Sequence, residues 1–533
     1  MQAYAGRWVA ILKDTDQVVG AGMTGPEALR QGRRNRPKTK LVVRYVPDES
    51  GNPLVLSPLL ADLERALSRI DQPIYLVGGA VRDALLGRMS HDLDFVVPAD
   101  GIKTAKRIGD FLRAPAFPLD DERDVGRVVL RRSGTYLDIA AFRAGSLDED
   151  LTDRDFTLNA MALPALARTT AELIDPLNGA EDLEHGRLRL ANSNGLKSDP
   201  VRILRGVRMS LKYQLEPDAE TITAMQEAIV LLNEVSPERV RDELLNILNV
   251  NGAEGLRMLH ELGLLSAILP RISDLVGVEQ SEPHHEPVFN HTLSVLAWLK
   301  KLLDGAAQAE WVQLIIEKLE PHLNRPVTGE RHGRDLLLLA ALYHDVGKAQ
   351  TQIRDEDGRI RFFKHDVEGA KITEKQLKYF RFSSEAVTHT AAVVRGHMRP
   401  LLLSSEPKLT ARAKHRFWKK LGTAGLDVCL LSIADHLATY TGPGEPEKWE
   451  QFKATIDALL SHWFEVEDPA IKAEPILTGR DLMNGLLMKG GPEIGRLLAL
   501  IEEAQVSGEV STAEEALELA RQSTTEANTR YQG

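Results

Sequence analysis

The sequence predicts an α+β fold in which a head of mixed strands and helices precedes an all-helical body. Strands and helices alternate from Ile74 to about Leu173, whereas from Asp199 onward apolar residues recur at the three- and four-residue spacing of helices. The chain has 533 residues, far more than a typical domain of one to two hundred residues. We therefore expect about three to five domains, the first of them built on a mixed sheet.

The first 50 residues predict a small α+β appendage. Short strands are expected at "RWVAILK" and "QVVGAGM", followed by a helix from Pro26 and a third strand at "KLVVRYV". Residues 47–58, "PDESGNPLVLSP", are rich in turn formers and predict a linker.

Further turn-rich stretches, "SEPHHEPVFN" and "TGPGEPEKW", divide the helical body. The sequence thus predicts five parts: the appendage 1–50, a head 55–185, a helical neck 186–275, a histidine-bearing helical domain 276–440, and a helical tail 441–533.

Composition narrows the class of protein. The net charge of −11 disfavours nonspecific coating of nucleic acid, although residues 187–212 hold seven Lys or Arg against one acid, Asp199. A single cysteine, Cys429, excludes an internal disulfide and fits a reducing compartment. The longest apolar run, Leu336–Tyr343, is far shorter than the roughly 20 residues of a membrane helix. The N-terminal residues lack the pattern of a secretion signal. We expect a cytoplasmic protein with no membrane partner.

A glycine turn is the first candidate for a binding site. "IYLVGG" predicts a buried strand that enters a turn at Gly78 and Gly79, and "AVRDALLG" predicts the helix that leaves it. Backbone N–H groups at such a helix start can bind phosphate, and Arg82 could add charge-assisted hydrogen bonds. Glycine turns before helices are also common structural devices.

The next strand, "DLDFVV", brings paired carboxylates to this turn. Side chains two apart in a strand share a face, so Asp92 and Asp94 are expected to project together. Mg²⁺ binds one or two carboxylates together with substrate phosphates, which favours phosphoryl or nucleotidyl transfer. Asp138 in "TYLDIAAFR" lies on another predicted strand and is a candidate third carboxylate. The alternative is a solvated strand edge whose acids have no shared function.

These motifs resemble those of the class II tRNA nucleotidyltransferase and bacterial poly(A) polymerase family, within the polymerase-beta-like nucleotidyltransferase superfamily. "GGAVRD" followed by "DLD" resembles the metal and triphosphate motif, and "RDFTLNAMAL" resembles the ribose-side motif. The resemblance implies a polymerase-beta-like head, Mg²⁺ ligation by Asp92 and Asp94, and nucleotide contacts by Gly78, Gly79, Arg82, Arg154, Asp155 and Asn159. The family usually has a second arginine where this chain has Asp153.

"SDPVRILRGVR" resembles the family's base-recognition motif. The resemblance implies that Asp199 and Arg202 hydrogen-bond the incoming base and that Arg205 lies in the same nucleotide site. A carboxylate accepts from an exocyclic amine and arginine donates to ring nitrogen and carbonyl, which suits cytosine and adenine. Alternatively, Asp199 before Pro200 predicts a helix N-cap.

The stretch between "AFR" and "RDFT" departs from many CCA-adding members of the family. Those members carry a long flexible loop there, whereas this chain has only residues 144–153, "AGSLDEDLTD". Members with a shortened loop can add CC and leave the terminal A to a partner enzyme. CC-only addition is therefore a subsidiary hypothesis.

A second set of candidate ligands lies in the helical body. It consists of histidines and aspartates, whose nitrogen and carboxylate oxygen atoms can bind a divalent transition metal. Their order resembles the HD metal-dependent phosphohydrolase superfamily, and the full set resembles its two-metal members, which implies these ligands: His291, His344, Asp345, His365, His397 and Asp435. The alternative is a helical RNA-binding body with buried, hydrogen-bonded histidines. The ligands alone leave open whether the metal is catalytic and on which substrate.

Together, the resemblances imply an enzyme that extends the 3′ end of tRNA from CTP and ATP, or from CTP only, and releases pyrophosphate. Mg²⁺ is the expected metal of the head, and a phosphodiesterase or phosphatase activity of the HD domain is a lesser expectation. The alternatives are a poly(A) polymerase, an HD phosphohydrolase with an RNA-binding head, and a nonenzymatic RNA-binding protein. The sequence leaves the oligomeric state open.

Overall fold

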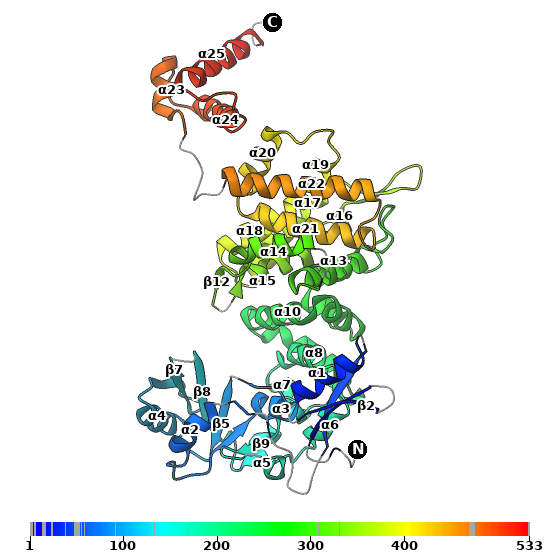
Figure 1. Ribbon diagram of the computed structural model, residues 1–533, viewed down its shortest axis with the longest axis vertical. Coiled ribbons are helices and arrows are strands. Elements are labelled where there is room, and N and C mark those ends of the chain that lie inside the picture. Colours follow the sequence, from blue (N-terminus) through cyan, green and yellow to red (C-terminus); the bar gives the residue numbers. More distant parts are fainter. Residues whose placement is uncertain are drawn as a thin grey trace. The chain divides into compact units, whose positions relative to one another are not determined.

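The structure is a computed structural model (Figure 1). It describes the whole chain except residues 1–3, 5–6, 13–16, 23–24, 38, 47–53, 55, 58, 91, 132–133, 168, 307–309, 330, 468–474 and 531–533. Most of the expected linker 47–58 lies outside the described residues. Contacts divide the chain into two compact units, 1–236 and 237–533, so the boundary falls inside the expected neck. The five-part division remains a prediction.

A three-stranded antiparallel sheet opens the first unit. Its strands β1 (Arg7–Leu12), β2 (Val18–Gly22) and β3 (Leu41–Val46) lie in the order β2-β1-β3, and α1 (Gly25–Asn35) packs against it. Trp8 contacts Ala28 of α1, whereas Val9 and Ile11 belong to a second apolar cluster with Val46. The expected strands and helix are confirmed, and the helix begins one residue before Pro26.

The head is built on a six-stranded mixed sheet, which confirms the predicted fold class. Its order is β6-β7-β8-β5-β4-β9, and only β5 and β8 pair in parallel. The strands are β4 (Tyr75–Val77), β5 (Leu93–Val97), β6 (Ala116–Asp120), β7 (Val125–Leu130), β8 (Thr135–Ala141) and β9 (Ala162–Pro164).

The two faces of β5 have different environments because strand side chains alternate. Leu93, Phe95 and Val97 join the main core, to which α2 (Leu59–Leu67) and α4 (Gly101–Leu112) contribute. Val96, on the opposite face, belongs to a smaller cluster with residues of α5. Asp94 alternates with this buried series and shares the face of Val96. Apolar packing on one face thus orients the carboxylate on the other.

Short helices complete the first unit. They are α3 (Gly79–Leu85), α5 (Leu147–Thr152), α6 (Gly179–Glu184), α7 (Gly195–Ser198), α8 (Arg202–Tyr213) and α9 (Ala219–Ala228). Strands β10 (Arg187–Leu188) and β11 (Glu216–Pro217) pair in parallel beside them.

Helices dominate the second unit. It begins with α10 (Pro237–Glu261), which is kinked where Asn251 has non-helical angles and accepts a hydrogen bond from Glu254 N at 3.2 Å. The asparagine thereby caps the second half of the helix. The bundle that follows packs α13 (Val288–Leu303), α15 (Gly333–Tyr343), α17 (His365–Tyr379), α18 (Ser384–Gly396) and α21 (Ala424–Thr439).

Further elements surround this bundle. The helices are α11 (Leu265–Ile268), α12 (Pro270–Ser273), α14 (Glu310–Leu323), α16 (Lys348–Thr351), α19 (Arg399–Ser404), α20 (Ala411–Leu421) and α22 (Pro446–His462). Two hairpins, β12 (Pro326–Thr328) with β13 (Arg331–His332) and β14 (Gln352–Arg354) with β15 (Ile360–Phe362), interrupt the helical pattern. The tail helices α23 (Gly479–Leu486), α24 (Pro492–Val506) and α25 (Ala513–Arg530) share their own apolar cluster.

Among the described residues, no single helix is long and apolar enough to cross a membrane. Helices α20 and α21 meet the length and composition criteria only as a pair bent by 107°.

Asp124 provides a test of how the head is held together. Its two carboxylate oxygens accept from Gly101 N at 2.8 Å and Ile102 N at 2.9 Å, the first residues of α4. Asp124→Asn replaces one acceptor with an amide that cannot accept, so we expect a loss of about 1–2 kcal/mol in the free energy of unfolding. Urea unfolding measures it. Asp121→Asn in the same turn is the control, and an equal effect of both changes would contradict the capping role.

Candidate active site and metal centre

Two carboxylates face each other across the parallel strand pair of the head. Asp94 of β5 lies in register with Asp138 of β8, and on its other side Asp94 pairs with Val77 of β4. Asp92 immediately precedes β5, is exposed, and its charge acts on Asp94. The structure therefore brings the three predicted acids into one region.

The charges of this region are only partly balanced. Asp94 reaches solvent, yet desolvation by the surrounding protein raises its pKa, and Asp138 raises it further. Arg154 and Arg127 oppose this shift. Asp138 has its own cation, because Arg127 donates from Nε and Nη2 to its two oxygens, both at 2.7 Å. The ionised form of Asp94 is therefore disfavoured, a property that a bound cation would relieve.

Gly78 turns the chain from β4 into α3 beside these acids. Its φ is +70°, a value that L side chains rarely adopt. A Cβ atom at Gly78 would lie 3.3 Å from Arg154 Nη1 and 4.0 Å from Asp94 Oδ2. Glycine is therefore required both by the turn and by the close approach of an arginine and a carboxylate.

Arg82 of α3 lies in a buried network. Its Nη1 donates to Asn159 Oδ1 at 2.5 Å, its Nε donates to Asp83 at 3.0 Å, and its guanidinium lies 4.2 Å from the ring centroid of Tyr213. Arg82 thus links the glycine turn to the predicted ribose-side motif. Direct contact of Arg82 with phosphate remains a prediction.

The predicted ribose-side residues are interconnected. Asp155 is buried and accepts from Phe156 N, from Asn159 Nδ2 at 2.9 Å and from Arg205 Nη1 at 3.1 Å. Burial by itself would raise the pKa of Asp155, but Arg205 and these hydrogen bonds outweigh it and lower the pKa. Asp155 is therefore an ionised anchor that holds Asn159 and Arg205 in place.

The predicted base-recognition pair lies where α7 meets α8. Arg202 Nε lies 3.9 Å from Asp199 Oδ2, and Arg202 Nη1 donates to the backbone oxygens of Gly195 at 3.2 Å and Asp153 at 3.4 Å. Helix α8 begins at Arg202 with Val201 in the N-cap position. The alternative that Asp199 is the N-cap is therefore wrong, because two residues separate Asp199 from the first helical residue.

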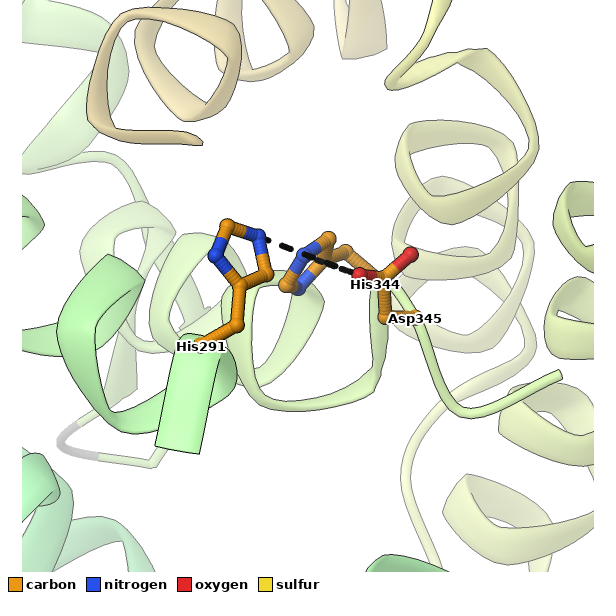
Figure 2. A group of neighbouring side chains, drawn as sticks. All are labelled: His291, His344 and Asp345. Atoms are coloured by element: carbon orange, nitrogen blue, oxygen red, sulfur yellow. Dashed lines mark ion pairs between the residues drawn. The ribbon is translucent and has the colours of Figure 1, made fainter. Parts of the chain in front are cut away.

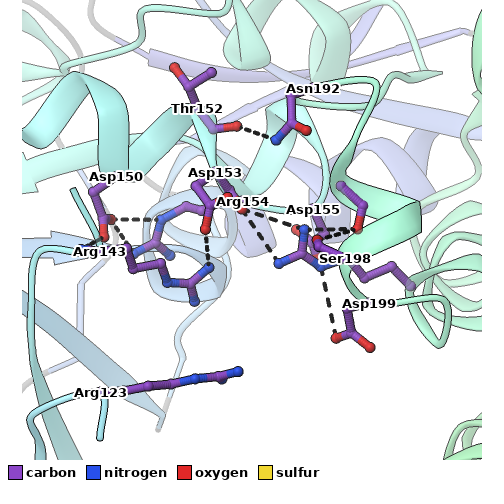
Figure 3. Close-up of polar contacts among 12 residues, drawn as sticks. Arg123, Arg143, Asp150, Thr152, Asp153, Arg154, Asp155, Asn192, Ser198 and Asp199 are labelled. Carbon is purple, nitrogen blue, oxygen red and sulfur yellow. Dashed lines mark hydrogen bonds and ion pairs between the residues drawn. The ribbon is translucent and has the colours of Figure 1, made fainter. Parts of the chain in front are cut away.

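The short segment 144–153 is an ordered part of this region (Figure 3). Ser146 caps α5 by accepting from Glu149 N, and fully buried Asp150 accepts from Arg143 N at 3.0 Å and from Arg154 Nη2 at 3.0 Å. Asn192 donates to Thr152 O at 2.6 Å. A buried carboxylate thus fixes the segment to the predicted ribose-side arginine.

The second unit brings the six predicted ligands together from distant stretches of sequence. His291 lies in α13, and His344 and Asp345 directly follow α15. His365 is the first residue of α17, His397 directly follows α18, and Asp435 lies in α21.

Asp345 lies at the centre of this set. Its Oδ2 is 3.2 Å from His344 Nε2 and 3.9 Å from His291 Nε2 (Figure 2). Its Oδ1 is 3.5 Å from His365 Nε2 and 3.8 Å from His397 Nε2. Each oxygen of one carboxylate therefore faces a different pair of histidines.

Backbone contacts fix the tautomers of three of these histidines. Each ring places Nδ1 against the carbonyl three residues earlier: His344 to Ala341 at 2.8 Å, His365 to Phe362 at 2.9 Å, and His397 to Val394 at 2.7 Å. Because a carbonyl only accepts, Nδ1 carries the proton and Nε2 is left as a ligand. His344 Nε2 is buried and makes no hydrogen bond to a described residue. This donor set fits a divalent transition metal.

Charge and close packing favour the same arrangement. Burial alone would raise the pKa of Asp345, but the positive charge of Lys348, whose Nζ lies 2.7 Å away, is the first influence that opposes it, and the pKa lies well below its usual value. Burial lowers the pKa of His397 to about 4, so this ring is neutral at pH 7. A Cβ atom at Gly347 would lie 2.1 Å from the carbonyl oxygen of His365, so glycine allows the two ligand-bearing segments to approach.

A cavity of about 300 Å³ opens onto this centre. Its lining includes Asp345 and Asp435 together with the basic side chains of Lys348, Arg359 and Arg361. An anionic group that entered the cavity would therefore meet positive charge beside the ligands.

Sequence reasoning missed several residues of both regions. His284 carries no predicted role, yet its ring lies 4.7 Å from that of His291, and burial together with Lys348 lowers its pKa to about 3. Asp150 and Arg127 were also missed. The i,i+4 spacing of Asp150 and Arg154 was the one local signal available, whereas the contact of Arg127 with Asp138 depends on the pairing of β7 with β8.

Known families match successive stretches of the chain. The poly(A) polymerase head domain matches residues 74–189, a probable RNA- and SrmB-binding site of polymerase A matches 214–275, the HD domain matches 288–440, and a putative tRNA nucleotidyltransferase domain 2 matches 371–520. An A-adding tRNA nucleotidyltransferase of Deinococcus radiodurans is 33% identical over 450 residues, which cover 83% of this chain and 93% of that protein. The chain belongs to the tRNA nucleotidyltransferase family.

Other members of the family agree with this assignment. A CC-adding tRNA nucleotidyltransferase of Thermus thermophilus is 34% identical over 467 residues, or 84% of this chain and 95% of that protein. The solved structure of a CCA-adding enzyme with CTP has the same fold, with a TM-score of 0.58 and 20% identity over 88% of this chain and 96% of that one. The predicted family and α+β fold are confirmed.

Gly78 gives this nucleotidyltransferase a stability test. Gly78→Ala places a side chain at φ +70° and 3.3 Å from Arg154, and we expect it to lower the free energy of unfolding by about 1–3 kcal/mol. Gly134→Ala is the matched control, because Gly134 has φ +66° and a Cβ atom there would meet no described atom within 4 Å. Urea unfolding should show a larger loss for Gly78→Ala. Equal losses would mean that the contact with Arg154 has no effect.

Proposed function

We propose that this enzyme adds CMP and AMP from CTP and ATP to the 3′ end of tRNA, with release of pyrophosphate. The observation that carries the proposal is the in-register pairing of Asp94 with Asp138 beside the positive-φ turn at Gly78. The names of the relatives support tRNA as the acceptor and disfavour a poly(A) polymerase.

In this proposal the head positions the two reacting groups. Asp92 and Asp94 would hold Mg²⁺, which when bound supplies charge neutralisation at the attacking and leaving oxygens. The turn at Gly78 and Gly79 receives the triphosphate beside Arg154, whose guanidinium lies against Gly78. The 3′ hydroxyl of the RNA attacks the α-phosphorus, the bond to the β-phosphate oxygen breaks, and pyrophosphate leaves.

Asp199 and Arg202 choose the base in this proposal. The carboxylate accepts from the exocyclic amine that cytosine and adenine share, and the guanidinium donates to a ring nitrogen or carbonyl. Arg202 suits this role because two backbone carbonyls, those of Gly195 and Asp153, orient its guanidinium. Its Nε makes no hydrogen bond to a described residue.

CC-only addition is the second candidate. Segment 144–153 is short and is fixed by Asp150, and a relative of 34% identity is named CC-adding. The relative named A-adding is 33% identical, so overall similarity does not choose between the two bases. In this proposal the choice between C and A rests on residues close to Arg202. Asp153, the last residue of segment 144–153, accepts a hydrogen bond from Arg202 through its backbone oxygen.

The HD residues support a phosphohydrolase activity on the same chain. Asp345, facing two pairs of histidines, would hold a divalent transition metal pair together with Asp435, and such metals polarise a phosphoryl oxygen. The basic lining of the adjacent cavity would orient a phosphate ester. A terminal 2′,3′-cyclic phosphate on RNA is a suitable substrate class. Water attacks the phosphorus, and cleavage of its bond to the 3′ oxygen restores the hydroxyl that the head extends and leaves the phosphate on the 2′ oxygen. We place the enzyme in the cytoplasm, where its single buried cysteine stays reduced.

Nucleotide incorporation tests the head. With tRNA transcripts that end one, two or three nucleotides before the mature 3′ end, wild-type protein should incorporate labelled C and A, or C only if the second candidate is correct. Asp94→Asn should lower the rate at least about a hundredfold, because it removes charge at the reacting phosphate, while tRNA binding is retained. Asp110→Asn on α4 is the control. Active Asp94→Asn protein would overturn the assignment.

Hydrolysis of a 2′,3′-cyclic phosphate tests the HD centre. His344→Ala removes a buried residue of the HD set, so it should abolish this hydrolysis and the transition metal that this set holds. Treatment of wild-type protein with a chelator should abolish the hydrolysis as well. Exposed His185→Ala is the control. Hydrolysis that survives in His344→Ala would reject the site, whereas metal binding without hydrolysis would make the centre structural.

A further inference from the structure

A second cluster of histidine and carboxylate lies in the helical unit and shares no residue with the HD set. His322 near the end of α14, His389 in α18 and Asp427 in the first turn of α21 place their ligand atoms within 4.8 Å of one another. His322 Nε2 is 3.0 Å from Asp427 Oδ1, and His389 Nε2 is 2.5 Å from Asp427 Oδ2. Both histidines are nearly buried, and Asp427 is fully buried.

The cluster repeats the construction of the HD centre along the same two helices. His389 precedes His397 by eight residues, and Asp427 precedes Asp435 by eight residues. Eight residues correspond to about 12 Å of helix. Helices α18 and α21 therefore carry one histidine and one carboxylate toward each centre. Helix α14 completes the second cluster, whereas α13, α15 and α17 supply the other residues of the HD set.

The polar contacts of the cluster cannot all be hydrogen bonds at the same time. The Nε2 atoms of His322 and His389 each contact Asp427, whose oxygens need a hydrogen-bond donor. The same two atoms also contact Arg325, whose N–H groups need an acceptor. Arg325 Nη1 lies 2.9 Å from His322 Nε2, and Arg325 Nη2 lies 3.0 Å from His389 Nε2. An imidazole nitrogen is a donor or an acceptor, never both at once. A metal ion at this point would accept both nitrogen lone pairs and the carboxylate together.

Arg325 stands in the place that such an ion would take. Its guanidinium also lies 3.8 Å from Asp427, so it supplies the positive charge that the buried carboxylate requires. The side chain is 28% exposed and has a path to solvent. Displacement of Arg325 by a divalent cation would therefore leave Asp427 paired with positive charge.

We propose that His322, His389 and Asp427 form a second transition-metal site, with Arg325 as the resident cation when the metal is absent. Two imidazoles and one carboxylate suit Zn²⁺ or a similar divalent ion. Bound metal would join α14, α18 and α21 and stabilise the unit that also carries the HD ligands. The site is independent of nucleotidyl transfer and of hydrolysis.

The test compares Co²⁺ and Zn²⁺ binding in full-length variants. Protein stripped with a chelator is reloaded with Co²⁺, desalted and assayed for bound cobalt and its visible spectrum. His389→Gln and His322→Gln should each bind one equivalent less than wild type and lose part of the Zn²⁺-dependent rise in Tm. The control His415→Gln changes a buried histidine outside both centres and should bind as wild type does.

Arg325→Gln separates a metal site from a network of ion pairs. If the metal displaces Arg325, removal of the competing cation should tighten Co²⁺ binding. Loss of a ligand should weaken it by more than the roughly 10- to 100-fold typical of lost outer contacts. Two results together would overturn the proposal: Arg325→Gln binds Co²⁺ no more tightly than wild type, and His389→Gln holds as much cobalt as wild type. These results would assign the cluster to ion pairing alone. Circular dichroism verifies the fold of each variant.

Discussion

The parallel pairing of β5 with β8 places two carboxylates next to each other, and the organisation of the head follows from that constraint. At the roughly 5 Å spacing of neighbouring strands, two like charges repel by about 3 kcal/mol at an effective dielectric constant near 20, and solvent at exposed Asp94 reduces this. Arg127 neutralises Asp138 with two hydrogen bonds. Asp94 keeps a raised pKa, which leaves it suited to a bound cation. Apolar packing beneath β5 prevents the strand from rotating to relieve the repulsion.

The helical unit also places a carboxylate at the centre of a site, but there positively charged and imidazole groups surround it. Asp345 is a buried carboxylate surrounded by imidazoles and by Lys348, whose positive charge lowers its pKa. Backbone carbonyls fix the protons of His344, His365 and His397 on the far side of each ring. These three contacts orient the rings without any metal. The cluster at Asp427 follows the same design with Arg325 as its cation.

The sequence predicted much of this organisation, and the limits of that prediction are physical. Asp92 and Asp94 were predicted to lie together because a strand alternates with a period of two, and the six HD residues were predicted through a motif whose order survives large separations. Arg127 and Asp150 carry no such pattern. Their importance arises from strand pairing and from a buried helix, which bring them to Asp138 and Arg154. The N-cap expectation for Asp199 failed because α8 starts three residues later, at Arg202.

The sequence by itself determined the mixed head, the helical body and the family, because periodicity and short motifs are local properties of the chain. It also determined which residue types were available for metal and nucleotide. Only the tertiary structure decided which of them meet. Asp94 and Asp138 are 44 positions apart by number, and His322 is joined to Asp427 across 105, so no local rule connects them. Packing of the sheet and of the bundle makes these contacts, because burial of apolar faces brings distant polar groups to the same place.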